Sequence, residues 1–162
     1  MTFAWPRFCQ ITLLASSLLV LSACGGGGGD GPSGSASVTV SDGSFYVPEG
    51  KFDSRGVEQQ TDTYPVLGPV QIIAYDMGGF GAGIGYIQNF PQAFYFAVLT
   101  TNSLEYSCVS QTWVDEFGQT APTCPNSVVL NATTKQAQVT NTLLTRKDLS
   151  SDTVTVSGNF DW

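Results

Sequence analysis

The sequence predicts an all-β fold, either an antiparallel β-sandwich or a small β-barrel of about eight to ten short strands. Apolar residues alternate or cluster in short runs that Gly, Pro, Asn and Asp separate, and a helical period is hard to find. Charged residues make up only 12% of the chain, whereas Ser, Thr, Asn and Gln are abundant. This composition is typical of exported β-rich proteins.

The first half of the expected domain contains short strands between turn signals. We expect strands over residues 37–40 and 44–47, on either side of the Asp42-Gly43 turn. Residues 51–63 are polar, and either a solvent-facing strand or a loop is compatible with them. Residues 69–75 form a clear strand, in which apolar side chains occupy both faces.

Glycine alternates with apolar residues over residues 79–86. Every odd position is Gly, and the even positions are Phe, Ala, Ile and Tyr. The spacing matches neither G-x-G-x-x-G nor a P-loop, so the glycines do not indicate a phosphate site. A strand with this pattern has one bare face and one apolar face. A tight hairpin with a strand over residues 93–100 would place Phe96 opposite Gly85, where its ring covers the bare face.

Three interpretations of the bare face stay open. The glycines serve strand curvature and packing, or the segment is a mobile glycine loop, or the face binds a ligand. For the last interpretation, the candidate ligand face is Gly81, Gly83, Gly85 and Phe96.

The second half continues the β pattern. We expect strands over residues 104–114, 128–130, 136–144 and 153–162, with a polar loop over 115–127. The last strand has the clearest alternation, and its apolar face consists of Val154, Val156, Phe160 and Trp162. Such a pattern predicts that the strand is tied into a sheet.

A short apolar run near the start has the features of a signal peptide. Arg7 lies in a short first region, and the apolar residues 11–21 would form only about 17 Å of helix, too short to cross a bilayer. The run ends at Leu21-Ser22-Ala23-Cys24, and five glycines follow. This motif resembles the lipobox of bacterial lipoproteins. An ordinary cleaved secretory signal is the alternative.

The resemblance implies cleavage between Ala23 and Cys24 and a lipid on Cys24, with palmitate among its acyl chains. Several acyl chains hold a protein stably on a membrane without a spanning helix. In this class, an Asp after the Cys favours the inner membrane. Gly25 stands there, so the resemblance implies the outer membrane of a Gram-negative bacterium.

The expected organisation is a signal peptide over residues 1–23, a lipidated Cys and Gly/Ser-rich tether over 24–37, and a single domain over 38–162. The whole chain has 13 acidic and 6 basic residues, and this excess of negative charge argues against nucleic acid as a partner. The expected partners are the membrane, through the lipid on Cys24, and an envelope protein or glycan.

Two cysteines remain in the expected domain, Cys108 and Cys124. An exported protein lies in an oxidising compartment, so we expect them to form a disulfide. A metal site is the alternative, but the chain has no histidine and two thiolates alone are a poor zinc set. No metal site and no cofactor is expected.

The sequence has no recognisable catalytic set. It lacks a histidine for a triad, and no serine lies in G-x-S-x-G. The carboxylates to consider are Asp76, Glu105 and Asp115-Glu116, the last of which is typical of a solvated turn. The leading hypothesis is therefore a non-enzymatic binding or scaffolding module. The alternatives are a small barrel that carries an apolar ligand and a carboxylate-dependent hydrolase.

Overall fold

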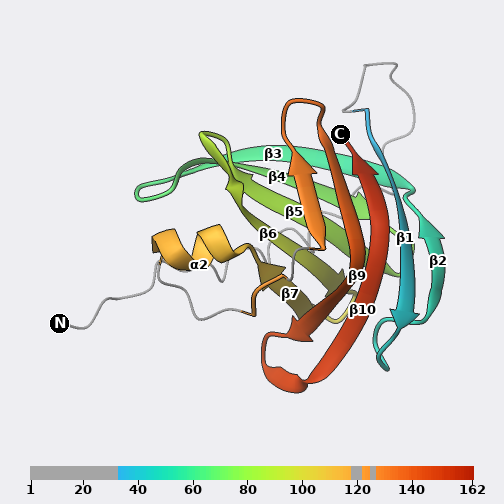
Figure 1. Ribbon diagram of the computed structural model, residues 1–162. Coiled ribbons are helices and arrows are strands. Elements are labelled where there is room, and N and C mark those ends of the chain that lie inside the picture. Colours follow the sequence, from blue (N-terminus) through green and yellow to red (C-terminus); the bar gives the residue numbers. More distant parts are fainter. Residues whose placement is uncertain (1–32, 118–121, 125–126) are drawn as a thin grey trace. The chain divides into compact units, whose positions relative to one another are not determined.

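The computed structural model describes residues 33–117, 122–124 and 127–162, which form an all-β domain (Figure 1). Ten strands and one short helix follow one another in the order β1 (Ser35–Asp42), β2 (Gly50–Asp53), β3 (Gly56–Tyr64), β4 (Gly68–Asp76), β5 (Phe80–Ile87), β6 (Phe90–Thr100), β7 (Glu105–Val109), α2 (Gln111–Phe117), β8 (Val128–Asn131), β9 (Gln136–Arg146) and β10 (Leu149–Asp161). The predicted signal peptide, Cys24 and most of the predicted tether lie outside the described residues.

All ten strands belong to one antiparallel sheet, with the order β2-β1-β10-β9-β7-β6-β5-β4-β3 and β8 paired to β9. The two edge strands, β2 and β3, are consecutive in the chain, and only Ser54 and Arg55 separate them. The Ser54 amide donates to the Ala36 carbonyl, and the Arg55 amide donates to the Asp76 carbonyl. Because two residues join the opposite edges of the sheet, the sheet curls into a half-barrel (Figure 1). Of the two predicted architectures, the barrel-like one is nearer to the structure.

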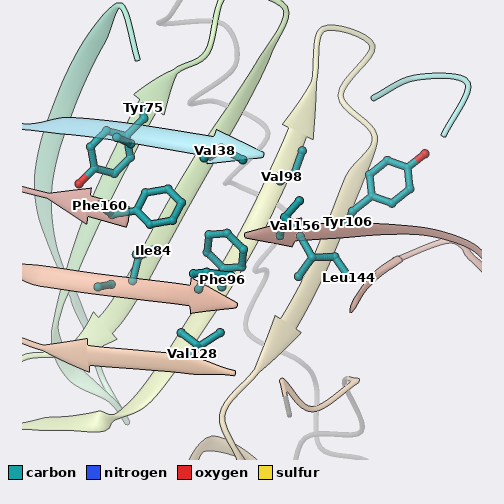
Figure 2. Close-up of a cluster of buried hydrophobic side chains, with 14 of the residues drawn as sticks. Val38, Tyr75, Ile84, Phe96, Val98, Tyr106, Val128, Leu144, Val156 and Phe160 are labelled. Carbon is teal, nitrogen blue, oxygen red and sulfur yellow. The ribbon is translucent and has the colours of Figure 1, made fainter. Parts of the chain in front are cut away.

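Side chains fill the concave side of this sheet. Phe96 and Phe160 are almost completely buried, and their ring centroids lie 5.5 Å apart. Tyr75 packs against Phe160, and its hydroxyl donates to the Asp161 carbonyl at 3.0 Å. Figure 2 shows these rings meeting Ile84 in the core. Strands far apart in the sequence are thus held together across the interior.

The strand predictions for residues 37–40, 69–75, 128–130 and 136–144 are confirmed. The polar residues 51–63, for which a strand and a loop were both possible, contain most of β2 and most of β3. Its polarity has a structural reason, because β2 and β3 are the edge strands and most of their residues are at least partly exposed.

Two predicted strands are wrong in whole or in part. Residues 44–47 form a turn, in which the Ser44 amide donates to the Val47 carbonyl at 2.9 Å. The expected strand over 104–114 ends at Val109, and α2 begins at Gln111. Ser110 is the N-cap of this helix, since its hydroxyl accepts a hydrogen bond from the Trp113 amide at 3.1 Å.

The last strand is confirmed as a half-buried strand, and it lies between β1 and β9 in the sheet. Its predicted apolar residues are all buried: Val154, Val156, Phe160 and Trp162. The tether prediction extends too far, because β1 already begins at Ser35. Backbone pairing with β10, which joins Ser35 to Asp161 and Ser37 to Asn159, makes this segment a strand although its side chains are small.

The predicted register of the glycine strand is wrong. The structure pairs Gly85 with Tyr95, and Phe96 pairs with Ile84. A change of one residue moves every side chain to the other face, so Phe96 lies on the core side and cannot cover the glycines. The irregular pairing next to the β5–β6 turn, between Tyr86 and Ile87, accounts for the shift.

The predicted disulfide is confirmed. Cys108 on β7 is joined to Cys124, and 16 positions separate them in the sequence. Cys108 is fully buried, and the Cys124 amide donates to the Val109 carbonyl at 2.7 Å. The bond therefore fastens the segment after α2 to β7.

Candidate functional site

The glycine stripe, defined as Gly81, Gly83 and Gly85, faces away from the core. The alternate residues of β5, such as Ile84, point into the core. A methyl group added at these glycines would meet only backbone oxygens of β4 and β6 within 4 Å, and the closest is the Ile73 carbonyl at 3.3 Å from Gly83. Since Phe96 is buried on the other side, the structure does not place the four predicted residues on one face.

The candidate carboxylates do not gather in one place. Asp115 lies on α2, whereas Asp76 ends β4 and accepts a hydrogen bond from the Gly78 amide at 2.7 Å. Asp76 and Glu105 share one row of the sheet, but three steps between strands put their Cα atoms about 14 Å apart. The side chain of Glu116 lies outside the described residues.

Glu105 is engaged within the domain. It accepts a hydrogen bond from the Tyr95 hydroxyl, and Lys147 Nζ lies 3.6 Å from its other oxygen. Burial raises the pKa of Tyr95 well above its usual value, and the negative charge of Glu105 raises it further. The phenol is therefore a donor to the carboxylate, and this arrangement joins β6 to β7.

Polar side chains form a small cluster near the other end of β4. The Thr61 hydroxyl donates to Gln71 Oε1 at 2.9 Å, and Gln88 Nε2 donates to the same oxygen at 3.1 Å. Thr61 and Gln71 are directly paired across β3 and β4. Because their hydrogen bonds are made to one another, these groups stabilise the edge of the half-barrel.

Among the residues whose side chains the structure describes, the most exposed aromatic side chain lies in the loop that joins β1 to β2. Phe45 is 95% exposed, whereas Val47, two residues later, is fully buried. The Ser44 hydroxyl accepts hydrogen bonds from the amides of Tyr46 and Val47, each at 3.2 Å. Hydrogen bonds to the Ser44 hydroxyl thus hold the loop, while the Phe45 ring projects into solvent.

An arginine stacks on the next aromatic residue. The Arg146 guanidinium lies 5.8 Å from the centre of the Tyr46 ring, a cation–π geometry. It also forms ion pairs with Asp148 at 2.6 Å and with Asp152 at 2.8 Å. Hydrogen bonding to Arg146 lowers the pKa of Asp148. We call Phe45, Tyr46, Arg146 and Leu149 the aromatic tip, because Leu149 pairs with Arg146 across the β9–β10 turn and is 45% exposed.

Hydrogen bonds connect the aromatic tip to the core through Tyr106. The Tyr106 hydroxyl lies 2.9 Å from the Ser44 hydroxyl and donates to Asp152 at 2.9 Å. Figure 2 shows this hydroxyl pointing away from the Phe96 ring. Burial raises the pKa of Tyr106, so the phenol stays protonated and keeps the loop and β10 joined.

Sequence reasoning missed the aromatic tip. It assigned residues 44–47 to a strand, which would have buried part of the Phe45-Tyr46 pair. A signal was present, because the turn residues Asp42-Gly43 and Pro48-Glu49-Gly50 leave only four residues between them. The stacking of Arg146 on Tyr46 could not be predicted from the sequence, since 100 positions separate the two residues.

Among residues 33–117, 122–124 and 127–162, no helix is long and apolar enough to span a membrane, and no group of three or more His, Cys, Asp or Glu side chains is placed to hold a metal ion. No protein-family model, curated protein or solved structure matches the chain.

Proposed function

We propose that this protein is a lipid-anchored component of the cell envelope and that its domain is a non-enzymatic binding or scaffolding module. The observation that carries the proposal is the motif Leu21-Ser22-Ala23-Cys24 at the end of a short apolar run. Lipid on Cys24 would hold the domain at the membrane, and Gly25 favours the outer membrane by the sorting rule of the class.

The Cys108–Cys124 disulfide supports an extracytoplasmic location, because such bonds persist in oxidising compartments. The carboxylates support binding rather than hydrolysis, since β5 and β6 lie between Asp76 on β4 and Glu105 on β7, and each carboxylate accepts a hydrogen bond from its own neighbour. The core supports a binding or scaffolding module over a carrier of an internal apolar ligand. The concave side of the sheet is occupied by Phe96, Phe160 and their neighbours.

Substitution of the lipid-bearing cysteine tests the proposal. In a Gram-negative host, Cys24→Ser should abolish incorporation of labelled palmitate and prevent maturation by the lipoprotein peptidase, because a hydroxyl cannot form the thioether to the lipid. The measurement is label in the immunoprecipitated protein together with its distribution between outer-membrane and soluble fractions.

Cys9→Ser is the matched control, because Cys9 lies in the segment that the peptidase removes. It should leave both the label and the membrane fraction unchanged. Equal labelling of Cys24→Ser and the unsubstituted protein would refute the anchor.

A further inference from the structure

The Phe45 ring projects from a hydrogen-bonded loop at one end of the domain. The Ser44 hydroxyl accepts hydrogen bonds from two amides of the loop, and Val47 is buried in the core. The Tyr106 hydroxyl forms a hydrogen bond with the Ser44 hydroxyl at 2.9 Å. A ring that is 95% exposed contributes little to the core, so the stability of the fold does not account for its position.

The residues around Phe45 are of the kinds that dominate binding energy at protein interfaces. Tyr46 packs edge-on against Phe45, with ring centroids 5.1 Å apart, and Arg146 stacks on Tyr46. Aromatic residues and arginine are enriched at the energetic centres of interfaces. The Arg146 side chain is only 14% exposed and pairs with Asp148 and Asp152. It therefore holds the Tyr46 ring in place, and little side-chain entropy of Tyr46 remains to be lost when a partner binds.

We propose that the aromatic tip is a docking surface for a partner protein that presents an apolar pocket with basic side chains at its rim. Around the tip, the exposed acidic residues outnumber the exposed basic ones. The acidic residues are Asp42 and Glu49, at the two ends of the loop, and Asp148, which is 63% exposed. The basic residues are Lys51 and Lys147. The excess of acidic residues complements a basic rim, and it disfavours an anionic lipid surface. The inference rests on the proposed function only in placing the partner in the cell envelope.

The start of β1 and the aromatic tip lie at opposite ends of one strand. The described chain begins at Ser33, next to the start of β1, and Phe45 follows the end of β1 (Figure 1). Eight residues of strand span about 27 Å. The tip therefore lies at the end of the domain opposite to the attachment of the tether.

Site-specific photo-crosslinking in cells tests this surface in the full-length protein. Phe45 is replaced by p-benzoyl-phenylalanine, an aromatic residue that retains the projecting ring. Val66 is the matched control, because it is an 81% exposed apolar residue in the turn between β3 and β4. We expect one ultraviolet-dependent protein adduct of defined mass at position 45 and none at position 66.

A charge change gives the second readout. Asp42→Lys with Glu49→Lys, combined with the probe at position 45, should weaken the adduct about tenfold, because the reversed charges repel a basic rim. Three outcomes would overturn the proposal: no protein adduct at position 45, an adduct with twice the mass of the chain, or adducts insensitive to the charge reversal. Palmitate labelling in the same cells reports the anchor separately, so failure of the docking surface is distinguishable from failure of the proposed function.

Discussion

Tyr95 shows how a single residue depends on contacts that are distant in the sequence. It pairs with Gly85 on one side and Val109 on the other, and its hydroxyl donates to Glu105. Burial and the adjacent carboxylate both raise the pKa of its phenol. The sequence identified Glu105 as a carboxylate near apolar strands, but its partner is fixed only by the pairing of β6 with β7.

Tyr95→Phe should make the protein less sensitive to alkaline pH. The raised pKa gives stability that is present in full below about pH 10, where the unfolded phenol ionises, and that is lost as pH rises toward the folded value. The free energy of unfolding should therefore fall less steeply above pH 10 in the variant. Urea unfolding at several pH values measures it, and parallel curves for the two proteins would contradict the assignment.

At the scale of elements, the glycines of two strands have different roles. A Cβ at Gly158 of β10 would lie 2.6 Å from the Ser37 carbonyl oxygen of β1, closer than real contacts allow. A Cβ at Gly81 of β5 would lie 3.7 Å from the nearest atom, the Tyr75 carbonyl oxygen. The close approach of the β1 backbone thus explains why residue 158 is a glycine. The glycine stripe is more conspicuous in the sequence, but no backbone approaches it as closely.

Alanine substitution distinguishes these roles. Gly158→Ala should lower the free energy of unfolding by about 1–3 kcal/mol, because β1 and β10 must move apart. Gly81→Ala should change it by less than about 1 kcal/mol, since the methyl group meets only ordinary contacts. Denaturant midpoints of the two variants give the comparison, and a larger loss in Gly81→Ala would show that the stripe is tightly packed.

At the scale of the whole molecule, stability comes from the concave side of the curled sheet. Phe96 on β6 and Phe160 on β10 meet there, and Tyr75 on β4 reaches the Asp161 carbonyl of β10. These contacts join strands that are not neighbours in the sheet. The aromatic tip, by contrast, adds exposed surface at one end of the domain.

Truncation of one buried and one exposed phenylalanine separates the two regions. Phe96→Ala should cost about 3–5 kcal/mol, because it leaves a cavity beside Phe160. Phe45→Ala should change the free energy of unfolding by no more than about 0.5 kcal/mol, since the ring is exposed. Chemical denaturation of purified protein measures both. A comparable loss in the two variants would mean that Phe45 belongs to the core.

The sequence by itself determined the β class, most strand positions, the half-buried pattern of β10 and the pairing of Cys108 with Cys124. The strand features follow from local periodicity and turn residues. The disulfide follows because the expected domain has only two cysteines. The tertiary structure decided the register of β5 with β6, the single curled sheet and the aromatic tip. Register depends on how one turn is built, curling depends on two edges joined by two residues, and Tyr46 meets Arg146 only after the sheet has formed.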